Sequence, residues 1–121
     1  MNSESIPESL SIPLAALANL GIEQWRLAAW LAGHPSTRDT APGRHAARKL
    51  EDFLKGCELE IRSMDGCAFD AGLAVRVIDT VDDAGLPAGA VVITETLSPM
   101  VLWRGHVIKT ADVVTSRGVR G

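Results

Sequence analysis

Valine and isoleucine recur at alternate positions between Gly66 and Val114, in short runs that glycine and proline interrupt. Branched side chains lose little rotamer freedom on a pleated surface, and alternation brings every second side chain to the same face. The runs occupy residues 73–81, 90–96, 101–109 and 111–114. Pro87 and Gly89 mark a turn between the first two runs. The pattern predicts four short strands in one compact β module.

A further strand is expected just before this module, at residues 58–62. Leu59 and Ile61 alternate there with charged side chains, as in a sheet with one solvated face. Upstream of it, apolar residues at three- and four-residue steps predict a helix. Its apolar positions are Leu14, Leu17, Ala18, Ile22, Trp25, Ala29 and Ala32.

The ends of the helices are predicted from capping residues. Ser11 before Pro13 is suited to begin the first helix, which ends at residues 33–35. Gly21 leaves open whether this stretch is one helix or two. A second helix is expected at residues 44–55, with Gly56 as its C-cap. Its apolar face is formed by Ala47, Leu50, Phe53 and Leu54.

The sequence therefore predicts an α+β protein, in which N-terminal helices precede a small, mostly antiparallel β domain. With 121 residues, the chain has room for one domain. The expected division is a flexible leader at 1–11, a helical segment at 12–56 with possible dimerisation, a β domain at 57–117, and a tail at 118–121.

Charge and hydropathy narrow the classes of function. The formal net charge of −3 gives no concentrated basic face, and acidic residues interrupt the basic stretch from Arg26 to Lys55, so nucleic-acid binding is not expected. No apolar run approaches the roughly 20 residues that span a bilayer. We expect a cytoplasmic protein that makes no membrane contact.

Neither a metal centre nor an enzymatic site is predicted. Cys57 and Cys67 have no neighbours at metal-ligand spacing and are expected to be buried or half-buried thiols. The three histidines lie in separate segments, and Asp70 follows Phe69 in a turn, where an Asx-turn role is favoured over that of a general base. We expect no catalytic residue, no metal and no cofactor.

The β module resembles the C-terminal β domain of the GrpE family, the nucleotide exchange factors of DnaK-type chaperones. The resemblance rests on the order and spacing of several motifs over roughly the last half of the chain. They are Leu54-Lys-Gly56, Gly66-x-x-Phe69-Asp70, Pro87-x-Gly89-x-Val91 and Gly105-His-Val-Ile108-Lys109-x-Ala111-x-Val113. Ala71 stands where the family has proline, Lys109 where it has arginine, and the family's long N-terminal helices are absent.

The resemblance implies a chaperone-associated protein that promotes ADP release from a DnaK-type ATPase. The alternative is an interaction or regulatory module that keeps the β fold without exchange activity. In the family, the β domain wedges against the ATPase, so the contact edge is expected between residues 100 and 109. Its candidate partner-binding residues are Met100, Trp103, Arg104, His106 and Lys109. The other interpretation of Trp103 is that it covers the module's own core.

The first helix carries an apolar surface that predicts a homodimer. Trp25 and Trp30 lie five residues apart, a net rotation of about 140°, so one narrow face cannot bury both rings. Leu27 and Leu31 extend the apolar patch, and pairing across a twofold axis would cover it. The expected dimerisation residues are therefore Trp25, Leu27, Trp30 and Leu31.

Overall fold

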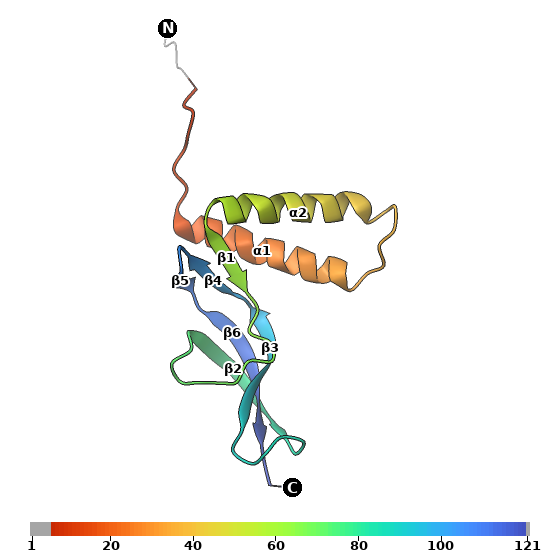
Figure 1. Ribbon diagram of the computed structural model, residues 1–121, viewed down its shortest axis with the longest axis vertical. Helices are drawn as coiled ribbons and strands as arrows, with labels where there is room; N and C mark the ends of the chain where they lie inside the picture. The colour runs from red at the N-terminus through yellow and green to blue at the C-terminus, as the bar shows by residue number, and fades with distance from the viewer. Residues whose placement is uncertain (1–5, 121) are drawn as a thin grey trace.

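The fold is that of a computed structural model, in which residues 6–120 are described. Two helices, α1 (Leu14–Ala32) and α2 (Ala41–Gly56), lie side by side at one end of the molecule, and the strands follow them (Figure 1). The strands are β1 (Leu59–Arg62), β2 (Val75–Asp83), β3 (Val91–Ser98), β4 (Met100–Trp103), β5 (His106–Lys109) and β6 (Ala111–Gly118). This arrangement confirms the predicted α+β class.

The strands form two small sheets rather than one module. The first sheet has the order β1-β4-β5 and the second the order β2-β6-β3. All pairs are antiparallel except β2 with β6, which is parallel. The strand expected at 58–62 is β1, and it pairs with β4 within the β domain predicted at 57–117.

The single strand expected at 101–109 is wrong, because the chain turns back in the middle of it. Arg104 and Gly105 have φ values of 50° and 80° and connect β4 to β5, with Trp103 paired opposite His106. Two successive left-handed residues match the type I′ turn, whose twist suits a two-residue hairpin.

Strand β4 contributes to both hydrophobic cores. Val101 belongs to the cluster under the helices, with Leu17, Ala18, Ile22, Leu54 and Leu59. Met100 and Leu102 belong to the second cluster, with Met64, Ile93, Ala111 and Val113. Because successive side chains of a strand point to opposite faces, β4 is buried on both sides. Its continuous apolar run, Met-Val-Leu-Trp, follows from this position.

Helix α1 differs from the sequence prediction at its start and at Gly21. It begins at Leu14 with Pro13 as N-cap and no side-chain capping bond, so Ser11 does not cap it. The helix continues through Gly21, which is buried against β1. A Cβ atom at Gly21 would lie 2.5 Å from Cδ1 of Ile61 and 3.0 Å from Cδ2 of Leu59, so glycine permits the close approach.

Helix α2 is longer than predicted and ends differently. It starts at Ala41, and Pro42 in its first turn suits a position where the missing N–H is harmless. Gly56 is its last residue, but the left-handed conformation that follows belongs to Glu58, with φ 64°. Phe53 is exposed rather than packed on the apolar face.

The chain ends also depart in part from the expected division. Residues 6–13 contain no helix or strand, whereas residues 1–5 of the predicted leader lie outside the described residues. Gly118, assigned to the tail, is the last residue of β6 and is buried, with its N–H donated to the Ala90 carbonyl at 2.8 Å.

We expect Gly118→Ala to lower the free energy of unfolding by about 1–3 kcal/mol, because the added methyl group would overlap the carbonyl oxygen of Pro87. Gly56→Ala is the matched control: no atom lies within 4 Å of its Cβ position, so its stability should be unchanged or slightly raised. Urea denaturation followed by circular dichroism measures both. Equal midpoints for Gly118→Ala and the wild type would contradict the close contact between Gly118 and the carbonyl group of Pro87.

Candidate functional site

Trp103 fixes the base of the β4–β5 hairpin to the rest of the fold. Its Nε1–H donates a hydrogen bond to the Cys57 carbonyl at 3.2 Å, at the end of α2. The indole is half-buried and packs against the cluster under the helices. Trp103 therefore covers the core, as one of the two interpretations held, while part of its ring stays accessible.

Arg104 lies on the outer side of that indole. Its guanidinium carbon is 4.4 Å from the centroid of the Trp103 ring, and its Nε–H donates to Glu58 Oε2 at 2.7 Å. The backbone N–H of Arg104 also donates to the Glu58 carbonyl at 3.1 Å. Both side chains of the ion pair are more than half exposed, so the pair contributes little to stability, about 0–1 kcal/mol.

Arg104 and Glu58 are also the two non-glycine residues with positive φ in the described chain. Left-handed backbone is unfavourable for side chains with a Cβ, by about 1–2 kcal/mol per residue. Asparagine or glycine would suit the first position of this turn better. The tip of the hairpin thus holds a solvent-facing guanidinium at a position where arginine is not the most stable choice.

The remaining residues predicted at this edge do not share one surface. Met100 is only 4% exposed and belongs to the second core, so its prediction as a partner-binding residue is wrong. His106 is exposed beside the turn. Lys109 is exposed at the other end of β5, where it lines a cleft of about 300 Å³ with α1 residues such as Asn19 and Arg26. The exposed hairpin tip is therefore formed by Trp103, Arg104 and His106.

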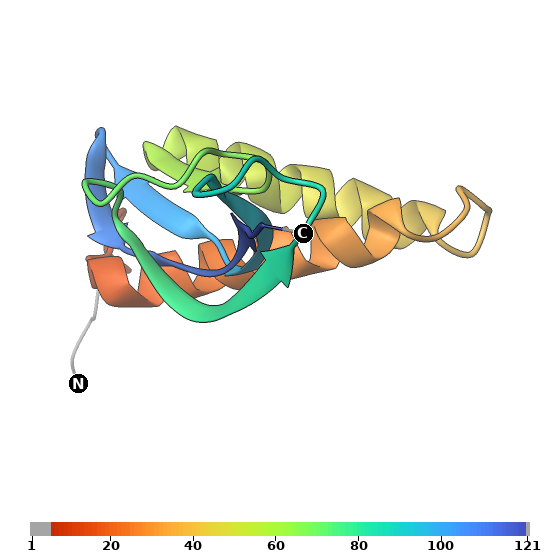
Figure 2. The same cartoon turned by 90° about the horizontal axis from the view of Figure 1, so that it is seen from below.

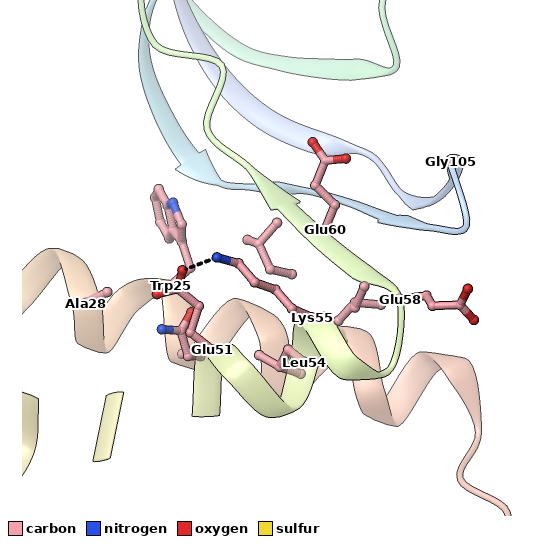
Figure 3. Close-up of a pocket in the computed structure, with 11 residues that line it drawn as sticks. Trp25, Ala28, Glu51, Leu54, Lys55, Glu58, Glu60 and Gly105 are labelled. Carbon is pink, nitrogen blue, oxygen red and sulfur yellow. Dashed lines mark ion pairs between the residues drawn. The ribbon is translucent and has the colours of Figure 1, made fainter. Parts of the chain in front are cut away.

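A groove of about 450 Å³ lies between the helices and β1, and it was not predicted from the sequence (Figure 3). Its apolar lining comes from three elements: Trp25, Ala28, Leu54, Leu59 and Ile61. Lys55 and Glu51 form an ion pair of 2.8 Å at its rim, and the rest of the lining comes from Gln24, Glu58, Glu60 and Gly105. No local pattern signals such a groove, because its residues meet only after α1, α2 and β1 pack together.

Lys55 is held in its charged form at the groove. The hydrogen bond that Lys55 Nζ donates to the Glu51 carboxylate raises the pKa of the ammonium above its ordinary value of 10.5, and the Coulombic attraction of the same carboxylate adds to this shift. The lysine therefore stays protonated at neutral pH and is unsuited to act as a base or nucleophile. The groove offers an apolar floor with a charged rim.

The residues predicted for dimerisation are spread around α1. Trp25 lines the groove and Leu27 is half-buried. Trp30 is 56% exposed, with its ring stacked on His34 at a centroid distance of 3.9 Å. Leu31 is only 4% exposed, so its place in a dimer surface is wrong. The reason is α2, which lies against this end of α1, where Arg44 donates to the Leu31 carbonyl at 2.9 Å.

Several smaller expectations concern turns and thiols. Asp70 Oδ1 accepts a hydrogen bond from the Gly72 N–H at 3.0 Å, which confirms the Asx turn. Cys57 is half-buried as expected, whereas Cys67 is exposed. Within residues 6–120, no three His, Cys, Asp or Glu side chains are grouped closely enough to hold a metal ion.

Neither helix of the described residues combines the length and the apolar character that crossing a membrane requires. In comparisons with known proteins, no family model and no curated protein matches this chain. The function must therefore be inferred from the sequence motifs and the geometry of these surfaces.

We expect Trp103→Ala to lower the free energy of unfolding by about 2–3 kcal/mol, since it removes a half-buried ring from the core. Arg104→Asn should change it by less than about 1 kcal/mol, because asparagine favours the turn while the exposed ion pair and cation–π contact are lost. Thermal and urea denaturation measure both variants. A large loss of stability in Arg104→Asn would mean that Arg104 is mainly structural.

Proposed function

We propose that this protein is a GrpE-like nucleotide exchange factor or co-chaperone, which promotes ADP release from a DnaK-type ATPase. The observation that carries the proposal is the backbone conformation of three of the four motif glycines, the fourth being Gly56 at the end of α2. Gly66, Gly89 and Gly105 are the three glycines of the described chain with positive φ, at 80°, 85° and 80°. The resemblance thus involves residues that form the turns of the β fold, not scattered matches.

The same motifs support the proposal through the turns around them. Asp70 closes an Asx turn after Phe69, and Gly89 donates its N–H to the carbonyl of Gly118, the last residue of β6, at 3.2 Å. A chain with this order of turns can present a short hairpin from a firm β scaffold. A wedge that acts on a partner's cleft needs such a scaffold more than it needs catalytic groups.

In this proposal, the hairpin tip contacts the ATPase through Arg104, His106 and the accessible edge of Trp103. An exchange factor accelerates release only if it binds the open nucleotide cleft more tightly than the closed one. A difference of about 1.4 kcal/mol between the binding free energies for the open and the closed cleft shifts the open-to-closed ratio tenfold. Arginine stacked on tryptophan is the kind of anchor that dominates protein interfaces. In this proposal Arg104 serves binding, although its left-handed backbone conformation makes the turn less stable than asparagine or glycine would.

We expect the protein to accelerate the release of a fluorescent ADP analogue from a DnaK-type ATPase in a stopped-flow experiment. Arg104→Asn should weaken this effect about tenfold or more, as for an interface anchor, with its stability preserved. Lys109→Glu should weaken it less, and Lys49→Glu is the matched control, because it makes the same charge change on exposed α2. An unchanged release rate at saturating protein would eliminate the exchange function and leave the interaction-module alternative.

A homodimer formed through α1 also remains part of the proposal. Leu20, Leu27 and Trp30 are exposed or half-exposed and follow one another at seven- and three-residue steps. They form a stripe along one side of the helix, which the exposed Glu23 interrupts between Leu20 and Leu27. Exposed apolar side chains gathered on one side of a helix are typical of an interaction surface. This stripe replaces the surface that included the buried Leu31.

Sedimentation equilibrium tests this stripe. We expect the wild type to form a dimer at tens of micromolar protein. A dissociation constant in this range corresponds to a binding free energy of about 6–7 kcal/mol. Leu20→Lys should yield the monomer, because it places a charge at the N-terminal end of the apolar stripe. Leu10→Lys, in the exposed segment before α1, is the control and should not alter the mass. A wild-type monomer at all concentrations would contradict the dimer.

A further inference from the structure

Strand β2 has one edge without a partner. It is nine residues long and pairs in parallel with β6 on one side only. Figure 2 shows the strand along the outside of the molecule, with its outer edge turned away from the rest of the chain. An open edge offers unpaired backbone N–H and C=O groups to another extended chain.

The other sheet edges in residues 6–120 are partly covered or short. The outer edge of β3 is paired with residues 66–69 at its first three residues, through hydrogen bonds of 2.8 Å that Gly66 N–H donates to Ile93 O and Ile93 N–H donates to Cys67 O. Further along β3, Thr96 Oγ1 accepts a hydrogen bond from Met64 N–H at 2.9 Å. Strands β1 and β5, at the edges of the first sheet, have four residues each. Strand β2 is thus the long edge that the described chain leaves open.

The regular part of this edge is its second half. The pairing of β2 with β6 is interrupted by a bulge between Val77 and Asp79, and it is continuous from Asp79 to Asp83. Asp79, Val81 and Asp83 pair with Val114, Ser116 and Gly118, alternate residues of β6. They therefore share one face of the sheet. Val81 is 50% exposed, between the two carboxylates.

The charges of this face are not neutralised within the chain. Asp82, on the opposite face, forms an ion pair of 2.9 Å with Arg117. Asp79 and Asp83 form no ion pair with any described residue; each accepts a backbone N–H bond of 2.8 Å, from Thr80 and from Gly85. The open edge thus presents an acidic, apolar, acidic sequence of side chains.

We propose that the outer edge of β2 binds an extended segment of a partner protein. This segment carries an apolar residue with one basic residue two positions before it and another two positions after it. The partner would add a strand to the second sheet, with backbone hydrogen bonds along residues 79–83. Its basic side chains would lie opposite Asp79 and Asp83, and its apolar side chain opposite Val81. A second copy of this chain is a poorer occupant, because its own aspartates would meet those of β2.

This site is separate from the hairpin tip and does not depend on the proposed exchange function. It lies in the second sheet, whereas β4 and β5 belong to the first. Failure of ADP release would therefore leave it untouched, and loss of peptide binding would leave exchange untouched.

Nuclear magnetic resonance titration of the full chain tests the proposal with a capped peptide that contains Lys-Thr-Val-Thr-Lys. We expect amide shifts centred on residues 79–83. Replacing both lysines by glutamate should weaken binding roughly two- to thirtyfold, the range for the loss of two opposite-charge cross-strand pairs. An otherwise identical peptide with N-methylated backbone amides should not bind, because it cannot donate to the strand edge.

Protein variants provide the reciprocal test. Asp79→Lys combined with Asp83→Lys should bind the glutamate peptide and reject the lysine peptide. Asp39→Lys combined with Asp52→Lys makes the same change in net charge at exposed sites on the helical hairpin, and it should behave as the wild type. Absence of shifts in β2 at millimolar peptide, or equal binding of the N-methylated peptide, would overturn the proposal. A dimer of the chain that Val81→Lys dissociates would also overturn it, since the edge would then be occupied.

Discussion

The contact between Gly21 in α1 and the side chains of Leu59 and Ile61 in β1 fixes the helical hairpin on the first sheet. That sheet consists of three strands of four residues, too little to be stable without a cover. The helices supply the cover through Leu17, Ile22 and Leu54 among others. The hairpin tip therefore has a firm base because a glycine lets a helix approach a strand closely.

Most elements of the fold could be predicted from the sequence, because helix and strand periods are local properties. The division into two sheets could not, since alternation indicates that a strand exists but not which strand pairs with it. The turn at Arg104 was missed for a related reason. Arginine is not a usual residue for a left-handed position, and the apolar run on either side of it reads as one strand.

The candidate site was predictable only in part. Met100 and Leu31 were expected on surfaces, yet each is buried by an element distant in sequence: the second core covers Met100, and α2 covers Leu31. Trp103 shows the intermediate case, with one part in the core and another beneath Arg104. The groove between α1, α2 and β1 had no local signal at all. Long-range packing decides whether a single side chain is buried, and the spacing of apolar residues along the sequence does not indicate which distant elements pack together.

The backbone crosses between the sheets at two single residues. Pro99, which is fully buried, separates β3 from β4, and Thr110 separates β5 from β6. Both strands of the hairpin thus continue directly into strands of the second sheet, without a flexible linker. A load applied at Arg104 would be carried along the covalent chain into β3 and β6. The hairpin is therefore attached at both of its roots to strands of the second sheet, so a partner that pushes on its tip would act on β3 and β6 through covalent bonds.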